Sequence, residues 1–305
     1  MEVPENLKEL FNHWEYQIER SKHIKKLNLK VDDKLILKIS EFMTERQLIW
    51  QRKVQGQTRP YTQDQILQNY RFCNIYRELD KQTIEFHSML KPLTLDFELW
   101  LLNMMYCRFV SNPQTVLLTG LLNLEDNQDV MTKLLNLPSP KYGSAYIFPI
   151  SIIQRSEYDT REKFFTKYLG LKVKECAMLI QSFDAIGVSE ALKMILPIFG
   201  FNFKFHWTEI LIDIAYQYPK FVNLFKQFPI GPGSMPTIKS LNSKEDSELV
   251  CLSLLTYRID NFPCLKYKDS EVKLSAENWE GIGCEYRKYV NLRNGDGRKR
   301  RYHNI

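Results

Sequence analysis

The segment from residue 62 to residue 82, TQDQILQNYRFCNIYRELDKQ, combines aromatic residues with polar side chains that can bind anions. Its polar members include Arg71, Asn74, Arg77, Glu78 and Asp80. A planar guanidinium favours bidentate contact with a phosphate or a carboxylate, and an Asn amide can read the edge of a nucleic-acid base. An intramolecular network in which Arg71, Arg77, Glu78 and Asp80 pair with neighbouring helices explains the segment as well as a phosphate-binding role does.

A T-x-x-Q pattern at Thr62 and Gln65 predicts a capping box and therefore a helix over this segment. The apolar face of that helix would consist of Phe72, Ile75, Tyr76 and Leu79. Their spacing of i, i+3, i+4 and i+7 indicates burial. Arg71, Asn74 and Glu78 would then lie on the opposite side, with Tyr70 and Arg77 at its flank. Such a helix could form the wall of a polar cleft.

A second candidate is the stretch HWTEILIDIAYQYP, residues 206–219. On a helix over 206–217, only Glu209, Asp213 and Tyr216 form a polar stripe, and apolar residues cover most of the remaining circumference. Partial burial would raise the pKa of a carboxylate and suit it to general acid or base catalysis. The alternative is a buried salt bridge to one of the arginines of residues 62–82.

The third candidate is the turn GPGS, Gly231 to Ser234. The backbone N–H groups of a tight glycine turn can converge on an anion, although a simple loop corner explains the same residues. The turn has neither the P-loop spacing nor a G-x-G-x-x-G pattern.

Other chemistries have no support in the residue spacing. The five histidines show no zinc-binding pattern, the six cysteines include no CxxC pair, and no G-x-S-x-G elbow is present. We therefore expect free thiols, no metal site and no cofactor.

The elements that position these residues are expected to be mainly α-helical, because alternation typical of strands is scarce. Helices are predicted at residues 5–55, 62–82, 94–110, 113–123, 127–136, 159–168, 172–183, 188–199, 206–217 and 247–259. Irregular regions rich in Pro and Gly are expected at 136–150 and 228–246.

The net charge of +6 is modest, but basic residues gather at the C-terminus. They are Arg287, Lys288, Arg293, Arg298, Lys299, Arg300 and Arg301. This cluster is either a phosphate contact or a solubilising end. The acidic N-terminus does not resemble a signal peptide, and no apolar run approaches the roughly 20 residues of a membrane span. We expect a soluble intracellular protein, in the nucleus of a eukaryote or in the cytoplasm of a bacterium or phage-infected host.

The stretch ERQLIWQRKVQGQTRPYTQDQILQNYRFCNIYRELDK resembles the opening of the alpha-glutamyl/putrescinyl thymine pyrophosphorylase family, also called amino acid:DNA transferases. The matching residues are Glu45, Arg46, Arg52, Gly56, Thr62, Asp64, Ile66, Tyr70, Arg71, Phe72, Asn74, Tyr76, Arg77, Glu78 and Asp80. That family shares a helical domain with the 5-hydroxymethyluracil DNA kinases, and its fold is similar to helix-hairpin-helix DNA glycosylases. The resemblance therefore implies a helical fold with a central cleft.

Shorter motifs extend the resemblance from about residue 40 to residue 302. TEILIDIAYQY resembles the family's helix after the hairpin, GPGS follows at the expected place, and CEYRKY…GDGRKRRY resembles its closing motif. The chain departs from the family in the hairpin, where FGFNFKFHW contains Gly200 as its only glycine. The resemblance suggests three segments: an N-terminal extension at 1–40, a glycosylase-like core at 41–246, and a C-terminal helix with the basic tail at 247–305.

The resemblance implies hypermodification of a thymine-derived base in DNA. A separate kinase converts 5-hydroxymethyluracil to a pyrophosphate, which the transferase displaces with an amine or amino acid. Asp213 or Glu209 would accept the proton. The residues expected to bind DNA or phosphate are Arg46, Arg52, Arg71, Asn74, Arg77, Gly231, Gly233, Ser234, Arg298 and Arg300. The residues expected to support the cleft are Tyr70, Glu78, Asp80 and Tyr216. DNA, the donor and the kinase are the expected partners, and no membrane is involved.

Two other functions stay open. In a true DNA glycosylase, Asp213 would support cleavage of the N-glycosidic bond. A DNA-binding module that has lost catalysis would also explain the altered hairpin and the basic tail.

Overall fold

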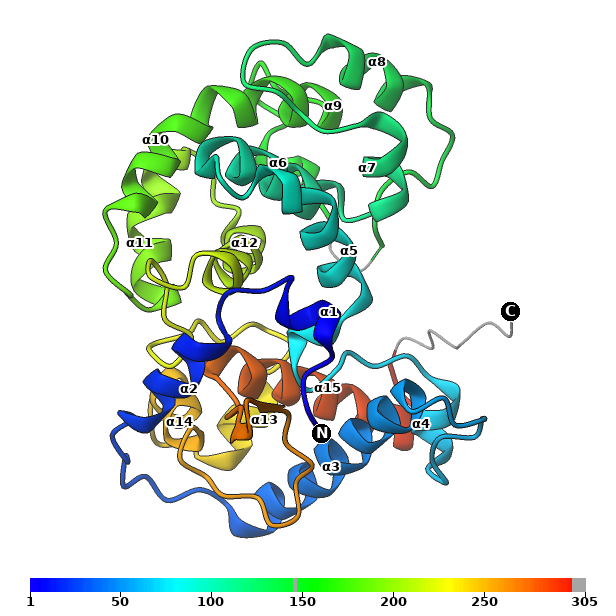
Figure 1. The fold of residues 1–305 in the computed structure, drawn as a ribbon, viewed down its shortest axis with the longest axis vertical. Helices are drawn as coiled ribbons and strands as arrows, with labels where there is room; N and C mark the ends of the chain where they lie inside the picture. Colours follow the sequence, from blue (N-terminus) through cyan, green and yellow to red (C-terminus); the bar gives the residue numbers. More distant parts are fainter. Residues whose placement is uncertain (145–146, 298–305) are drawn as a thin grey trace. The chain divides into compact units, whose positions relative to one another are not determined.

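The computed structural model describes residues 1–144 and 147–297, and this part of the chain is mainly helical (Figure 1). Its only named strands are β1 (Lys266–Tyr267) and β2 (Ser270–Glu271), which pair antiparallel. The predicted α-helical class is therefore confirmed. All six cysteines are free thiols, as expected. Within the described ranges, no helix has the length and apolar character needed to cross a bilayer.

The chain divides into two compact units that are interleaved along the sequence. The first unit contains residues 1–8, 14–80 and 224–305, and the second contains residues 9–13 and 81–223. The chain thus visits the second unit briefly at residues 9–13, enters it again after Asp80 and returns to the first at Leu224. The boundaries expected after residues 40 and 246 both lie inside the first unit, so they do not coincide with boundaries between the compact units.

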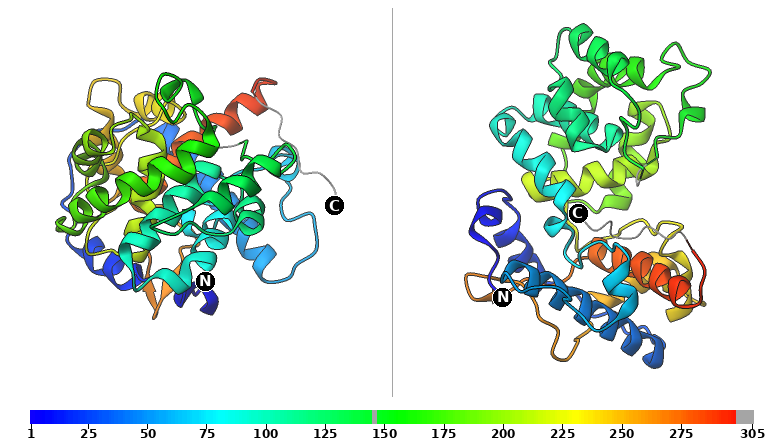
Figure 2. Two further views of the ribbon diagram at one scale, coloured as in Figure 1. Left: turned by 90° about the horizontal axis from the view of Figure 1, so that it is seen from above. Right: turned by 90° about the vertical axis from the view of Figure 1, so that its right-hand side faces the viewer.

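The long helix α15 (Ala276–Arg293) organises the first unit, where it packs against α3, α4, α13 and α14 (Figures 1 and 2). Its partners are α3 (Asp33–Val54), α4 (Gln65–Asn69), α13 (Met235–Leu241) and α14 (Ser247–Leu254). The unit also contains α1 (Glu5–Lys8), α2 (Trp14–Lys22) and the 3-10 turn η1 (Arg77–Leu79). A capping box at Ser275 and Asn278 defines the start of α15.

Helix α6 (Phe97–Val110) is the central helix of the second unit. Nearly all of its residues are buried, as expected for a helix that is apolar around most of its circumference. It packs against α5 (Lys81–Leu90), α7 (Pro113–Thr119), α10 (Leu169–Gln181) and α12 (Lys204–Gln217). The remaining elements are η2 (Lys91–Leu93), α8 (Gln128–Asn136), η3 (Ile150–Ile152), α9 (Arg161–Lys163), the π-helix η4 (Phe164–Tyr168) and α11 (Val188–Phe199).

The predicted helix over residues 62–82 is wrong. Helix α4 occupies only Gln65–Asn69, and its N-cap is Asp64 rather than Thr62, because the Asp64 carboxylate accepts the N–H groups of Ile66 and Leu67. Beyond α4, Asp80 accepts the backbone N–H of Asn74, which stabilises a turn in place of a helix. The four residues of the expected apolar face are nevertheless buried, since each is at most 8% exposed.

The other helix predictions have mixed outcomes. The range 188–199 agrees with α11 at both ends, and helices are present near 94–110, 113–123, 127–136, 159–168, 172–183, 206–217 and 247–259. The range 5–55 is interrupted, because α2 ends at Lys22 and α3 begins after its N-cap Asp32. Helices α5, α13 and α15 were not predicted.

An aromatic cluster around His206 fills part of the second unit. The imidazole stacks on Phe109 with a centroid distance of 4.8 Å and an interplanar angle of 10°. Phe148 and Phe203 also contact the ring. Nε2 of His206 has no hydrogen-bond partner within the described part of the chain. Burial lowers the pKa of His206 to about 4, so the ring is neutral at pH 7.

This burial predicts a loss of stability in mild acid. Below pH 6.5 the unfolded state protonates at His206, whereas the folded state stays neutral until about pH 4. The free energy of unfolding should therefore fall between these two values by up to roughly 3 kcal/mol. Urea unfolding at a series of pH values should show a shallower decline for His206→Phe, and equal slopes for both proteins would contradict the prediction.

Candidate functional site

Asp213 in α12 is fully buried and bound from two other helices of the second unit. Arg108 of α6 donates Nε to Oδ2 at 2.5 Å and Nη2 to Oδ1 at 2.6 Å. Nε2 of His87 in α5 lies 3.1 Å from Oδ1. Arg108 also donates Nη2 to Oγ1 of Thr83 at 3.3 Å. The carboxylate is therefore held in a bidentate ion pair.

The electrostatics of this ion pair oppose the expected catalytic role. Burial alone would raise the pKa of Asp213, but the guanidinium of Arg108 and the hydrogen bond of His87 outweigh it and hold the pKa at about 2. Burial also lowers the pKa of His87. The prediction that burial raises the carboxylate pKa is wrong for Asp213, which is a weak proton acceptor. The alternative of a buried salt bridge is correct, although the partner is Arg108 rather than an arginine of residues 62–82.

The polar stripe of α12 does come together as the sequence indicated. Glu209 is 5% exposed, and its Oε2 lies 3.9 Å from Nη1 of Arg108. Tyr216 is fully buried, with its ring centroid 4.8 Å from that of His13. Sequence reasoning missed Arg108. The available signal was a single arginine in the apolar run LWLLNMMYCRFV, because a lone charge in a buried helix needs a partner.

In the first unit, Arg46, Asn74 and Asp80 form an internal network. Arg46 is 8% exposed and donates Nη2 to the Phe72 carbonyl at 3.0 Å and to Oδ1 of Asn74 at 2.8 Å. The Asn74 amide donates to the Leu79 carbonyl at 2.8 Å and to Oδ1 of Asp80 at 3.0 Å. Of the four residues of the intramolecular alternative, Asp80 belongs to this network, and the contacts of Arg46 and Asn74 likewise support a structural role.

Arg52 also makes contacts within its own unit. It donates Nη1 to Oε1 of Glu45 at 2.8 Å and to the Tyr61 carbonyl at 2.5 Å, which ties the loop after α3 to that helix. Tyr70 is the C-cap of α4. Glu78 is fully buried within η1.

Arg71 and Arg77 lie close together in the chain but differ in exposure. Arg71 is exposed, whereas Arg77 in η1 is partly buried. The Arg71 carbonyl accepts a hydrogen bond from Nζ of Lys288, and this ammonium lies 4.5 Å from the centroid of the Phe72 ring. Arg71 and Lys288 therefore place two cationic residues together in the first unit.

The GPGS turn binds an anion that belongs to the protein itself. Oγ of the fully buried Ser234 donates to Oε1 of Glu280 at 2.6 Å, and the N–H of Gly231 donates to the same oxygen at 3.1 Å. Arg287 donates to the carbonyl of Pro232 at 2.9 Å. The turn is thereby fastened to α15. The two other residues expected to bind phosphate, Arg298 and Arg300, lie outside the described residues.

The ion pair of Asp213 predicts a large difference between two conservative variants. Asp213→Asn leaves the buried Arg108 without its bidentate partner and should cost about 3–5 kcal/mol in the free energy of unfolding. Glu209→Gln should cost less, because its carboxylate lies 3.9 Å from Arg108. Urea unfolding at pH 7 provides the comparison. Equal losses in the free energy of unfolding would contradict the assignment of Asp213 as the main partner of Arg108.

Close packing of the GPGS turn on α15 predicts a difference in stability between alanine variants of two glycines. A Cβ at Gly233 would lie 2.5 Å from Sγ of Cys284, whereas a Cβ at Gly281 on the same helix meets no atom within 4 Å. Gly233→Ala should therefore destabilise the protein by about 1–3 kcal/mol. Gly281→Ala should be neutral or stabilising. The Cys284→Ala background should reduce the loss at Gly233, and an unchanged loss there would exclude this clash as its cause.

Comparison with known proteins places the chain in a family. A family model described as the 5-hmdU DNA kinase, helical domain, matches residues 33–299. No curated protein and no solved structure matches the chain. The expected relation to the kinase helical domain is confirmed, whereas these comparisons give no support for the thymine pyrophosphorylase family specifically. Through its relatives the chain is linked to DNA hypermodification, and it belongs to the 5-hmdU DNA kinase helical domain family.

Proposed function

We propose that this chain acts on DNA carrying a base derived from 5-hydroxymethyluracil and transfers an amine or amino acid to that base after its activation as a pyrophosphate. The observation that carries the proposal is the family match over residues 33–299, which includes segments of both compact units. The partners in this reaction are DNA, the amine donor and a 5-hydroxymethyluracil DNA kinase that supplies the activated base.

The reaction defines what the protein must provide. The amine nitrogen forms a bond to the exocyclic methylene carbon of the base, and the bond from that carbon to the pyrophosphate oxygen breaks. Pyrophosphate leaves with the electron pair, and the proton of the amine passes to a base. Cationic groups stabilise the departing anion. Within the first unit, Arg71 and Arg77 are the residues proposed to bind phosphate, and the basic residues of the C-terminal tail would contact the DNA backbone.

Glu209 is the better of the two proposed proton acceptors. Asp213 uses its oxygens in bonds to Arg108 and His87, and its pKa of about 2 leaves little affinity for a proton. Glu209 lies one helical turn earlier on α12, and its ion pair with Arg108 is longer at 3.9 Å. Asp213 would then act by fixing Arg108 beside Glu209.

A second candidate function is DNA binding without catalysis. Two observations favour it: the carboxylate of Asp213 is already paired with Arg108, and donors of the GPGS turn already bind Glu280. Neither group is then available for an external phosphate or amine without losing an internal partner.

Nucleoside mass spectrometry tests both functions. DNA containing 5-hydroxymethyluracil would be treated with a suitable kinase and then with this protein in the presence of amino acids and polyamines. We expect a new, heavier thymidine derivative. Glu209→Gln should abolish it, because the proton acceptor is lost. Lys53→Ala, a change at an exposed residue of α3, should leave its yield unchanged.

The other outcomes separate the alternatives. Loss of the base with an abasic product would identify a glycosylase. Unchanged nucleosides together with retained affinity for the DNA, measured by fluorescence anisotropy, would identify the binding function. Full activity in Glu209→Gln would exclude that residue as the proton acceptor, and Asp213→Asn would then be tested after its folding had been confirmed by urea unfolding.

A further inference from the structure

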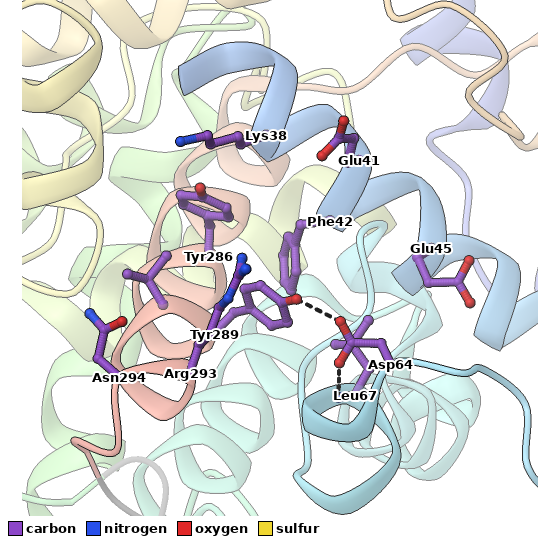
Figure 3. A pocket seen from close by; sticks show the side chains of 11 residues that line it. Lys38, Glu41, Phe42, Glu45, Asp64, Leu67, Tyr286, Tyr289, Arg293 and Asn294 are labelled. Carbon is purple, nitrogen blue, oxygen red and sulfur yellow. Dashed lines mark hydrogen bonds between the residues drawn. The ribbon is translucent and has the colours of Figure 1, made fainter. Parts of the chain in front are cut away.

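A pocket in the first unit lies among α3, α4 and the C-terminal half of α15 (Figure 3). Its volume is about 620 Å³. This value lies within the range of roughly 300–1,000 Å³ that is typical of small-molecule sites. None of the proposed catalytic residues lines it, and Arg293 is its one member of the basic C-terminal cluster described above.

One wall of the pocket is aromatic. Phe42 of α3 contacts two tyrosines of α15, with ring centroids 5.7 Å from Tyr286 and 5.1 Å from Tyr289. Tyr289 is the more exposed of these rings. Its hydroxyl donates to Oδ2 of Asp64 at 2.5 Å, which fixes the orientation of the ring (Figure 3). The rings do not share a plane, because Phe42 is inclined at 46° to Tyr289 and at 68° to Tyr286, so the surface on which a planar ring can stack is the ring of Tyr289 itself.

Of the three carboxylates that line the pocket, Glu45 has a cationic partner and Asp64 has neutral hydrogen-bond donors. Glu45 pairs with Arg52 at 2.8 Å. Asp64 caps α4 by accepting the N–H groups of Ile66 and Leu67, in addition to its bond with Tyr289. These contacts leave Glu41 as the third lining carboxylate.

The basic side has no such compensation. Lys38 and Arg293 are exposed, and within the described part of the chain neither has an ion-pair partner. In Figure 3 both side chains lie on the side of the pocket that holds Tyr286, away from Glu45. Glu41 and Asp64 keep their negative charge, so the two cations do not dominate the pocket as a whole; they lie together on one side of it, and that side favours the anionic part of a ligand.

We propose that this pocket binds a nucleoside phosphate. The base stacks against Tyr289, and Lys38 and Arg293 hold the phosphate. Glu41 accepts a hydrogen bond from a sugar hydroxyl or from an N–H group of the base. The same chemistry is offered by a free mononucleotide and by a nucleotide of single-stranded DNA. The proposal does not depend on the transfer reaction, since none of the proposed catalytic residues lines the pocket.

Titration calorimetry with thymidine 5′-monophosphate tests the pocket, with thymidine and inorganic phosphate as partial ligands. The monophosphate should bind more tightly than either part. Lys38→Ala and Arg293→Ala should each weaken binding about tenfold, because each loses a charge-assisted contact. Tyr289→Leu should weaken binding and Tyr289→Phe should retain it, because the ring rather than the hydroxyl carries the stacking. Lys53→Ala, on the same helix as Lys38 but outside the pocket, is the matched control.

An oligothymidine of eight nucleotides distinguishes a nucleotide of single-stranded DNA from a free mononucleotide as the natural ligand. Tighter binding of the oligonucleotide, weakened by the same three variants, would assign the site to a DNA strand. Binding of the monophosphate alone would assign it to a free nucleotide. The proposal would be overturned if neither ligand bound. It would also be overturned if Lys38→Ala, Arg293→Ala and Tyr289→Leu left the affinities unchanged while urea unfolding showed these variants to be folded. Because binding is measured without a kinase or donor, failure of the transfer assay leaves this result unaffected.

Discussion

The second unit depends on the ion pair between Arg108 and Asp213. A guanidinium and a carboxylate that are both buried are tolerated only when their charges and hydrogen bonds are satisfied together. Arg108 belongs to α6 and Asp213 to α12, while His87 and Thr83 contribute from α5, so one set of contacts connects three helices. The same bonds that stabilise this unit lower the basicity of Asp213. Structural stability and proton transfer therefore compete for one carboxylate.

A similar constraint acts in the first unit, where the GPGS turn meets Glu280. The turn offers the N–H of Gly231 and the hydroxyl of Ser234, which are typical donors to an anion, and the carboxylate of α15 accepts both. Burial raises the pKa of Glu280, and these two hydrogen bonds oppose that rise. An anion-binding pattern in a sequence therefore does not distinguish an external phosphate from an internal carboxylate. Only the partner across the fold decides between them.

Periodicity was sufficient to predict helices such as α11, whose apolar and polar residues follow one another regularly. It failed over residues 62–82, where the side chains of Asn74 and Asp80 bind the backbone beyond the short helix α4 and replace helical hydrogen bonds. It also failed for α15, whose interior contains Gly281 and Gly283. The polar stripe of α12 was predicted correctly as a group. The pKa of Asp213 was not, because Arg108 lies 105 positions away in the sequence and local patterns contain no information on that pairing.

The distribution of compensated and uncompensated charge indicates where an external ligand can bind at least cost. Removing a carboxylate such as Asp213 from its partner leaves a buried charge, whereas Lys38 and Arg293 have no ion pair to lose within the described residues. New contacts to an anion at these exposed cations add to the internal bonding and do not replace it. The family match extends over segments of both units, and the pocket proposed to bind a nucleotide belongs to the first. Recognition of a nucleotide can therefore reside in the first unit while Arg108 and Asp213 keep the second unit folded.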